Sequence, residues 1–86
     1  MTGLVLHVTL TSTTDGGMLL DERTGRMFHL NTSGHEIVRA SIDGGSEEAV
    51  ERLRTRYGLS PEHARREVET LLGDLVERGL MHGGGR

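Results

Sequence analysis

Five histidines are the residues of this chain best suited to metal binding or proton transfer. They are spread along the sequence, at His7, His29, His35, His63 and His82. No two of them have the spacing of H-E-x-x-H, which places two imidazoles on one face of a helix. The sequence therefore predicts no metal site and no paired histidine centre.

Other reactive groups also lack the context that catalysis needs. The adjacent carboxylates Asp21–Glu22 and Glu47–Glu48 fall in stretches expected to be exposed, without the burial that raises a carboxyl pKa. No G-x-S-x-G motif occurs, and the glycine pairs lack the Lys and Ser/Thr of a phosphate loop. The chain contains no cysteine. We therefore expect a protein that is not an enzyme and uses no cofactor.

The size and net charge of the chain limit the kinds of partner that it could bind. The chain has 86 residues, which is one small domain, and a net charge of −3. A mildly acidic chain without a basic block disfavours nucleic-acid binding, because phosphate neutralisation supplies much of that affinity. No stretch of about 18 apolar residues and no signal-peptide pattern occurs. We expect a cytoplasmic protein with neither nucleic acid nor membrane as its partner.

Hydrophobic patterns in the first 30 residues predict three strands. Apolar and other residues alternate over residues 4–10, which is typical of a half-buried strand. Two short apolar runs follow at residues 18–20 and 27–30, separated by a turn that contains Gly25. Such a pair predicts a hairpin, and the three strands together an antiparallel meander.

Two helices are expected in the middle of the chain. Ser33 and Glu36 have the spacing of a capping box, in which each side chain satisfies a free amide at a helix start. This first helix is expected to end at Gly44–Gly45. Ser46 then caps a second helix, which Gly58 ends.

A third helix is predicted from Pro61 to about Arg78. Ser60 is a capping residue, and proline is favoured at the first helical position. Gly79 closes the helix. Its expected apolar stripe consists of Ala64, Val68, Leu71, Leu72, Leu75 and Val76. The predicted fold class is α+β, with one domain over residues 1–80 and a flexible tail over 81–86.

The third strand has the features of a binding edge. In a meander this strand keeps a free side unless another segment pairs with it, and exposed edges are usually protected by charge or proline. Residues 26–31 contain no proline and one charge. An extended peptide could add there as a further strand. The alternative is that Phe28 and Leu30 only fill the core and that the first strand covers this edge.

Three stretches together resemble the PqqD-like family, also called RiPP recognition elements. They are residues 17–34, similar to the family's strand pair and helix start, residues 37–44, similar to its first helix, and residues 68–80, similar to its closing leucine-rich helix. One departure is Val38, where many relatives have an aromatic residue. The resemblance implies a winged helix-turn-helix-like fold.

The family resemblance, strongest to the standalone proteins of lasso-peptide biosynthesis, also implies a function. A non-catalytic protein of this kind binds the leader peptide of a precursor as an added strand beside its third strand, in a groove walled by its third helix. It then presents the precursor to a transglutaminase-like leader peptidase and, as a further potential partner, a macrolactam cyclase. The implied peptide-binding residues are Arg26, Met27, Phe28, His29 and Leu30 on the strand and Glu67, Val68, Leu71, Leu72, Asp74 and Leu75 on the helix.

Other functions stay open at this stage. The second and third predicted helices, joined at residues 57–61, could form a helix-turn-helix, so a winged-helix DNA-binding regulator is the main alternative. Acidic residues outnumber basic ones on the exposed part of the third helix, which opposes phosphate binding. A structural or regulatory interaction domain is a further alternative. A homodimer through the open strand edge is also compatible with the sequence.

Overall fold

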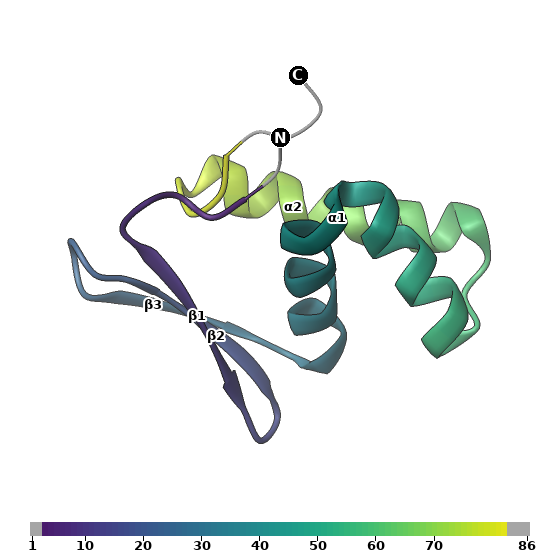
Figure 1. The fold of residues 1–86 in the computed structure, drawn as a ribbon, viewed down its shortest axis with the longest axis horizontal. Coiled ribbons are helices and arrows are strands. Elements are labelled where there is room, and N and C mark those ends of the chain that lie inside the picture. Colours follow the sequence, from purple (N-terminus) through teal and green to yellow (C-terminus); the bar gives the residue numbers. More distant parts are fainter. Residues whose placement is uncertain (1–2, 83–86) are drawn as a thin grey trace.

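The computed structural model describes residues 3–82. Its elements follow in the order β1 (Val8–Thr13), β2 (Gly16–Asp21), β3 (Arg26–Leu30), α1 (Thr32–Tyr57) and α2 (Pro61–Glu77). The strands form one antiparallel sheet in the order β1-β2-β3, and the helices pack over one part of it (Figure 1). The predicted α+β class and the antiparallel meander are therefore confirmed.

The central strand carries the contact between sheet and helices. Leu19 on β2 lies opposite Leu10 on β1 and Phe28 on β3. Because side chains alternate across a sheet, these three residues share one face. Leu19 is fully buried, and Leu10 and Phe28 pack against the same core. This face is the one that the helices cover.

The first strand lies later in the chain than expected. The predicted strand covered residues 4–10, whereas β1 begins at Val8. Leu4 instead forms an isolated bridge with Met81, and the Val5 N–H donates to the Leu80 carbonyl at 3.1 Å. Met81 is 2% exposed, so the folded part extends past the boundary expected at Leu80. Residues 83–86 of the expected tail lie outside the described residues.

Helix α1 begins with a different cap from the predicted one. The side chain of Asn31 accepts a hydrogen bond from the Gly34 N–H at 2.7 Å, which is the N-cap interaction. Ser33 donates its hydroxyl to the Asn31 side chain at 3.2 Å. The expected capping box of Ser33 and Glu36 is therefore wrong. The Glu36 carboxylate lies 3.5 Å from the Arg52 guanidinium instead.

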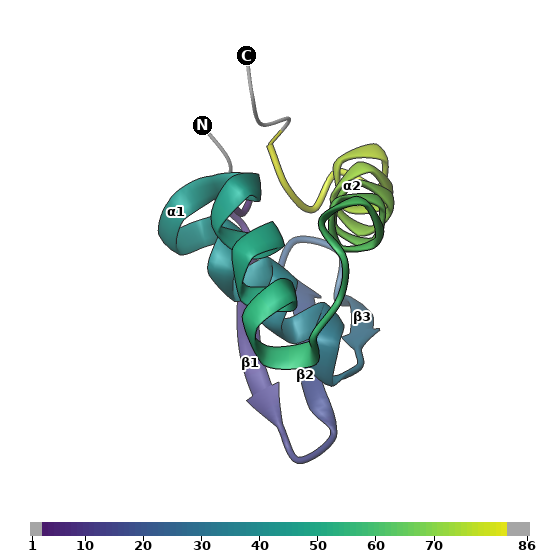
Figure 2. The same ribbon diagram turned by 90° about the vertical axis from the view of Figure 1, so that its right-hand side faces the viewer.

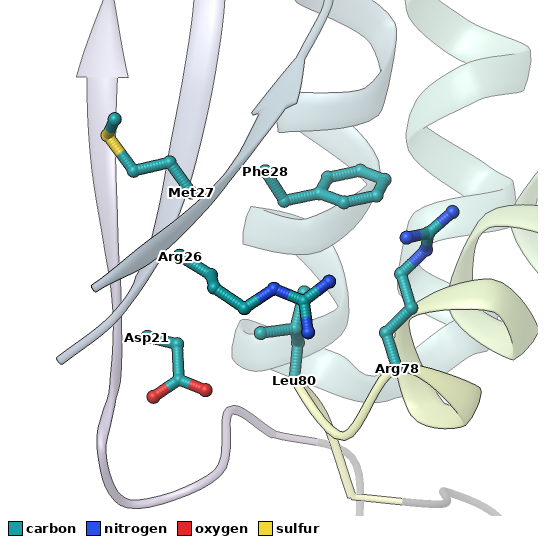
Figure 3. Close-up of a pocket in the computed structure, with 6 residues that line it drawn as sticks. All are labelled: Asp21, Arg26, Met27, Phe28, Arg78 and Leu80. Atoms are coloured by element: carbon teal, nitrogen blue, oxygen red, sulfur yellow. The ribbon is translucent and has the colours of Figure 1, made fainter. Parts of the chain in front are cut away.

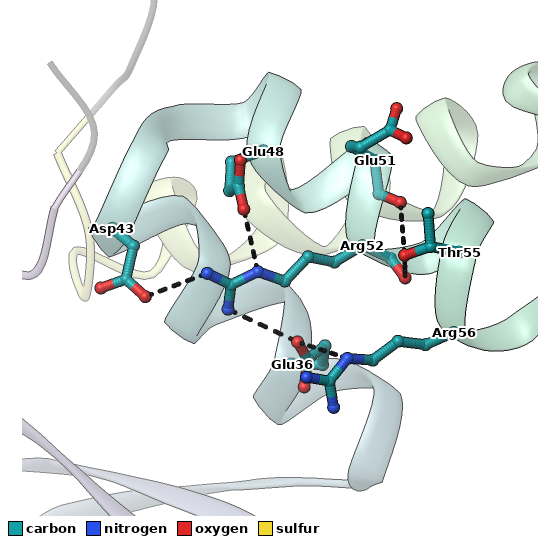
Figure 4. Close-up of polar contacts among 7 residues, drawn as sticks. All are labelled: Glu36, Asp43, Glu48, Glu51, Arg52, Thr55 and Arg56. Atoms are coloured by element: carbon teal, nitrogen blue, oxygen red, sulfur yellow. Dashed lines mark hydrogen bonds and ion pairs between the residues drawn. The ribbon is translucent and has the colours of Figure 1, made fainter.

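Within residues 3–82, two helices follow the sheet and not three. The first two predicted helices form the single element α1, which continues through a kink at Gly44–Gly45, where Gly45 has φ of 85°. Arg52 bridges this kink, because its guanidinium pairs with Glu36 and Asp43 before it and with Glu48 after it, at 3.5, 3.3 and 3.0 Å (Figure 4). The hydrogen bond to Glu48 contributes most to raising the pKa of Arg52. The expected winged helix-turn-helix arrangement is not confirmed.

Helix α2 begins and ends as the sequence predicts. The Ser60 hydroxyl accepts from the His63 N–H at 3.2 Å, and proline occupies the first turn. At the other end Gly79 has φ of 79°, and the Leu80 N–H donates to the Leu75 carbonyl at 2.9 Å. This is a Schellman motif, in which the left-handed glycine lets the chain reverse onto its own helix.

In the described part of the chain the core consists of two clusters, and α2 contributes to both. One cluster joins the sheet to the C-terminal part of α2, through Leu19 and Leu75 among others. The other joins α1 to the N-terminal part of α2, through Leu53 and Val68 among others. Figure 2 shows β3 on the α2 side of the sheet and β1 on the α1 side. Within residues 3–82, no helix is long and apolar enough to cross a membrane.

Candidate functional site

Strand β3 has a free edge in the described part of the chain. The order β1-β2-β3 places β1 at the opposite edge, so β1 does not cover β3. Leu30 is 6% exposed and Phe28 is half-buried, whereas Met27 is 58% exposed. The strand therefore contributes to the core through alternate side chains while its outer backbone edge stays open.

A groove of about 740 Å³ runs between this strand and α2. Its α2 wall consists of residues three or four positions apart, which places them on one helix face. The start of α1 forms its end. The groove is lined by Phe28, His29 and Leu30 on β3, by Asn31, Ser33, Gly34 and Ile37 at the start of α1, and by Glu67, Thr70, Leu71, Asp74 and Glu77 on α2.

A smaller pocket of about 130 Å³ adjoins the groove at the C-terminal end of α2. We call it the arginine pocket; Asp21, Arg26, Met27, Phe28, Arg78 and Leu80 line it (Figure 3). Phe28 lines both cavities. The Arg78 guanidinium lies 4.9 Å from the centre of the Phe28 ring, a cation–π distance. Phe28, over which Arg78 lies, is therefore shared by the groove and the arginine pocket.

The charges of the two cavities differ in sign. The α2 wall of the groove presents the carboxylates of Glu67, Asp74 and Glu77, whereas the pocket presents the guanidinium groups of Arg26 and Arg78. The site is therefore acidic along the helix and basic at one end.

The carboxylate in the arginine pocket belongs to Asp21, the last residue of β2 before the turn to β3. Burial acts to raise the pKa of Asp21, but hydrogen bonds from the backbone N–H groups of Arg23 and Thr24, the nearby His7 and the Thr24 hydroxyl together outweigh it, and the pKa is lowered. Asp21 is therefore ionised and engaged with its own turn.

The structure brings together eight of the eleven residues expected at a peptide site. Met27 and Arg26 line the arginine pocket, and Phe28 lines both cavities. The remaining five line the groove: His29, Leu30, Glu67, Leu71 and Asp74.

Three expected helix residues do not line either cavity. Val68 and Leu75 are both 0% exposed and belong to the core, so neither can contact a peptide in the groove. Leu72 is half-buried and packs against both core clusters without lining the groove. The expectation that Val68 and Leu75 belong to the binding surface is therefore corrected, because α2 turns their side chains into the core, whereas the role of Leu72 stays a prediction.

Several lining residues were not predicted. Thr70 lies three positions after Glu67 and four before Asp74, and Glu77 lies three after Asp74, so helical periodicity could have found both. Arg78 and Asp21 could not be found in this way, because the arginine pocket forms only where the end of α2 returns to the β2–β3 turn.

The histidines take part in separate local contacts. The His35 Nε2 lies 3.2 Å from the Ser12 hydroxyl, His7 Nε2 lies 3.5 Å from Asp21, and His63 Nε2 lies 3.5 Å from Glu67. Across residues 3–82, no group of three or more His, Asp or Glu side chains is placed to hold a metal ion.

Comparisons with solved structures show the same architecture elsewhere. The chain is similar to a lasso peptide synthetase B1 complexed with its leader peptide, with 28% identity, a TM-score of 0.85 and coverage of 95% of this chain and 98% of the other. It is also similar to TbiB1 in complex with the TbiA(beta) leader peptide, with 23% identity, a TM-score of 0.82 and coverage of 98% and 99%.

A more distant likeness is to Streptococcus suis SuiB bound to S-adenosylmethionine, with 10% identity and a TM-score of 0.56, over 94% of this chain and 24% of that one. At their identities, TbiB1 and SuiB show the fold alone. A comparison with curated proteins gave no match. The model of the family "Coenzyme PQQ synthesis protein D (PqqD)" matches residues 16–81, most of the chain. The chain thus belongs to the PqqD family and is a PqqD-like RiPP recognition element.

Proposed function

We propose that this protein is a non-catalytic recognition protein that binds the leader region of a ribosomally made precursor peptide by strand addition to β3. The observation that carries the proposal is the open edge of β3 beside a groove walled by α2. An added strand would satisfy the free backbone groups of β3 and place alternate side chains in the groove.

Similarity to leader-bound proteins supports this function. The solved relative at 28% identity is a lasso peptide synthetase B1 complexed with the leader peptide, and it matches nearly the whole chain. This likeness favours lasso-peptide biosynthesis over other pathways of the family. The open edge of β3 is the element that a peptide of this kind needs.

The chemistry of the groove indicates how a leader would be held. Main-chain pairing with β3 sets the register of the peptide, and apolar contacts with Phe28 and Leu71 supply most of the affinity. The protein would then present the bound precursor to a transglutaminase-like leader peptidase and to a macrolactam cyclase, since tethering raises the effective concentration of substrate at an active site.

A titration tests the proposed function directly. A fluorescently labelled leader peptide, taken from a precursor gene beside the gene for this chain, is titrated with the full chain, and its anisotropy is measured. Duplex DNA of similar length serves as the control for the winged-helix alternative. We expect saturable binding of the peptide and no specific binding of the duplex. Absence of peptide binding by protein with a folded circular dichroism spectrum would refute the proposal.

The same edge could also pair with a second copy of the chain. Light scattering after size exclusion, with and without the leader, measures this competition. If the copies pair through β3, saturating peptide converts dimers into monomeric complexes, because both partners use the same backbone groups. A dimer that binds peptide without dissociating places its interface elsewhere.

A further inference from the structure

We propose that the peptide bound beside β3 is bipolar: it places a carboxylate side chain in the arginine pocket and a basic side chain against the acidic wall of α2. The order of these two charges would then select the direction in which the peptide runs. This inference rests on the proposed function and adds to it the charge class of the ligand.

The first observation concerns the guanidinium group of Arg26. It lines the arginine pocket, and no ion pair joins it to a carboxylate within residues 3–82. Asp21 is opposite it on β2. However, Asp21 Oδ1 accepts the backbone N–H groups of Arg23 and Thr24 at 3.0 and 3.4 Å. Because Arg26 has no ion-pair partner among residues 3–82, its guanidinium remains available to an anionic group from a ligand, which would share the pocket with the Asp21 carboxylate.

Arg78 reaches the same pocket from the other wall. Its Nε donates to Asp74 Oδ1 at 3.1 Å, and its guanidinium lies over the Phe28 ring. These contacts orient the group, and its two terminal nitrogens make no hydrogen bond to the described residues. Figure 3 shows the guanidinium groups of Arg26 and Arg78 extending into the space between β3 and the end of α2. Two such groups suit a carboxylate, which accepts paired N–H donors.

The groove itself is lined by negatively charged side chains of α2. Glu67, Asp74 and Glu77 line the α2 wall. Glu77 has no ion-pair partner among residues 3–82, and Glu67 contacts only His63, at 3.5 Å. Burial of a peptide beside three carboxylates would favour a basic side chain and disfavour an acidic one. Asp74 also orients Arg78, so the acidic and basic parts of the site are joined at this residue.

Helix geometry gives the spacing of the two charges on the ligand. Glu67 and Asp74, beside which the Arg78 guanidinium lies, are separated by about 10 Å along α2, at 1.5 Å per residue. An extended peptide that runs along α2 covers that distance in about three residues, at roughly 3.3 Å per residue. The ligand should therefore carry an acidic and a basic residue about three positions apart, in one order and not the other.

A display experiment tests this charge order without assuming a sequence for the ligand. A library of random 15-residue peptides is selected against the immobilised full chain, and the enriched sequences are compared. We expect an acidic and a basic residue at one fixed separation and in one order. Enriched peptides without that pattern, or with both orders equally, would overturn the bipolar ligand while leaving peptide capture intact. No enrichment at all would refute peptide capture itself, and the bipolar ligand with it.

Matched variants then assign the charges to residues. An enriched peptide and its Glu→Gln version are titrated against the wild type, Arg26→Gln and Arg39→Gln. Arg39 is an exposed arginine of α1 that lines neither cavity, so its variant changes net charge equally. We expect Arg26→Gln to weaken binding of the acidic peptide about three- to five-fold, as for a partly exposed ion pair. The affinity of the Gln version of the peptide should stay unchanged. Equal losses in both variants would show a general charge effect and overturn the assignment.

Discussion

Leu71→Ala should weaken peptide binding and protein stability by similar amounts, because the side chain serves two surfaces. Leu71 is half-buried, packs against both core clusters and lines the groove. The substitution removes three carbon atoms, worth about 2.4 kcal/mol if fully buried, at about 0.8 kcal/mol each. The folded core covers about half of the Leu71 side chain, and a bound peptide would cover the rest. The substitution should therefore lower the free energy of unfolding by about 1 kcal/mol and weaken the free energy of binding by about 1 kcal/mol. The second amount corresponds to roughly five-fold in Kd.

Two measurements on the same variant separate these contributions. Urea unfolding followed by circular dichroism gives the loss of stability, and anisotropy with the labelled leader gives the change in Kd. Val76→Ala is the matched control, because Val76 lies on the same helix, is 37% exposed and lines neither cavity. A folded Leu71→Ala protein with wild-type Kd would remove this residue from the site. Equal weakening by Val76→Ala would show that the groove wall has been assigned to the wrong face of α2.

Three further substitutions test other parts of the structure. Gly16→Ala should destabilise the fold more than Gly25→Ala in urea unfolding: both glycines have positive φ, but only at Gly16 would an added Cβ clash with backbone, that of Leu30 and Asn31. Comparable losses of stability in the two variants would contradict the close approach of the Leu30 and Asn31 backbone to Gly16. Met27→Ala should leave stability nearly unchanged, since the side chain is 58% exposed, and should weaken leader binding; unaltered affinity would exclude Met27 from the site. Hydrogen bonds from Arg65 lower the pKa of Glu47 below its ordinary 4.5, so this pair stabilises the fold above that pH and loses its effect as pH falls through the lowered value. Glu47→Gln should thus destabilise the protein at pH 7 and show a smaller further loss on acidification, whereas parallel pH profiles would contradict the interaction.

The parts of the fold that depend on neighbouring residues could be predicted from the sequence. The β2–β3 hairpin follows from two short apolar runs with a glycine between them, and the ends of α2 follow from a serine, a proline and a glycine, all acting within a few positions. The start of β1 could not be predicted in this way. Leu4 continues the alternating pattern of the strand, yet its partner is Met81, at the far end of the chain. A local pattern indicates that a residue is apolar on one side, but it does not indicate which segment covers it.

The sequence does not show whether the helix ends at Gly44–Gly45 or continues after a kink, because the outcome depends on contacts between distant side chains. A glycine pair normally ends a helix, and Gly45 does adopt the left-handed conformation expected there. The chain nevertheless resumes its helix after a kink, and Arg52 joins carboxylates on both sides of it. These contacts connect side chains as far apart in the sequence as Glu36 and Arg52, so a search for capping residues near the glycines does not include them.

The sequence of α2 likewise does not show which of Leu71 and Leu72 faces the groove. Successive helical residues are about 100° apart, so Leu71 and Leu72 lie about 60° and 40° to opposite sides of Val68, which points into the core. Both flanks of the apolar stripe carry charged residues, and the sequence contains no signal that distinguishes them. The sheet makes the distinction: β3 lies against the flank of Leu71, and its free edge turns that flank into a groove. The specificity of this small domain therefore arises from the position of one edge strand relative to a helix whose sequence would suit either face.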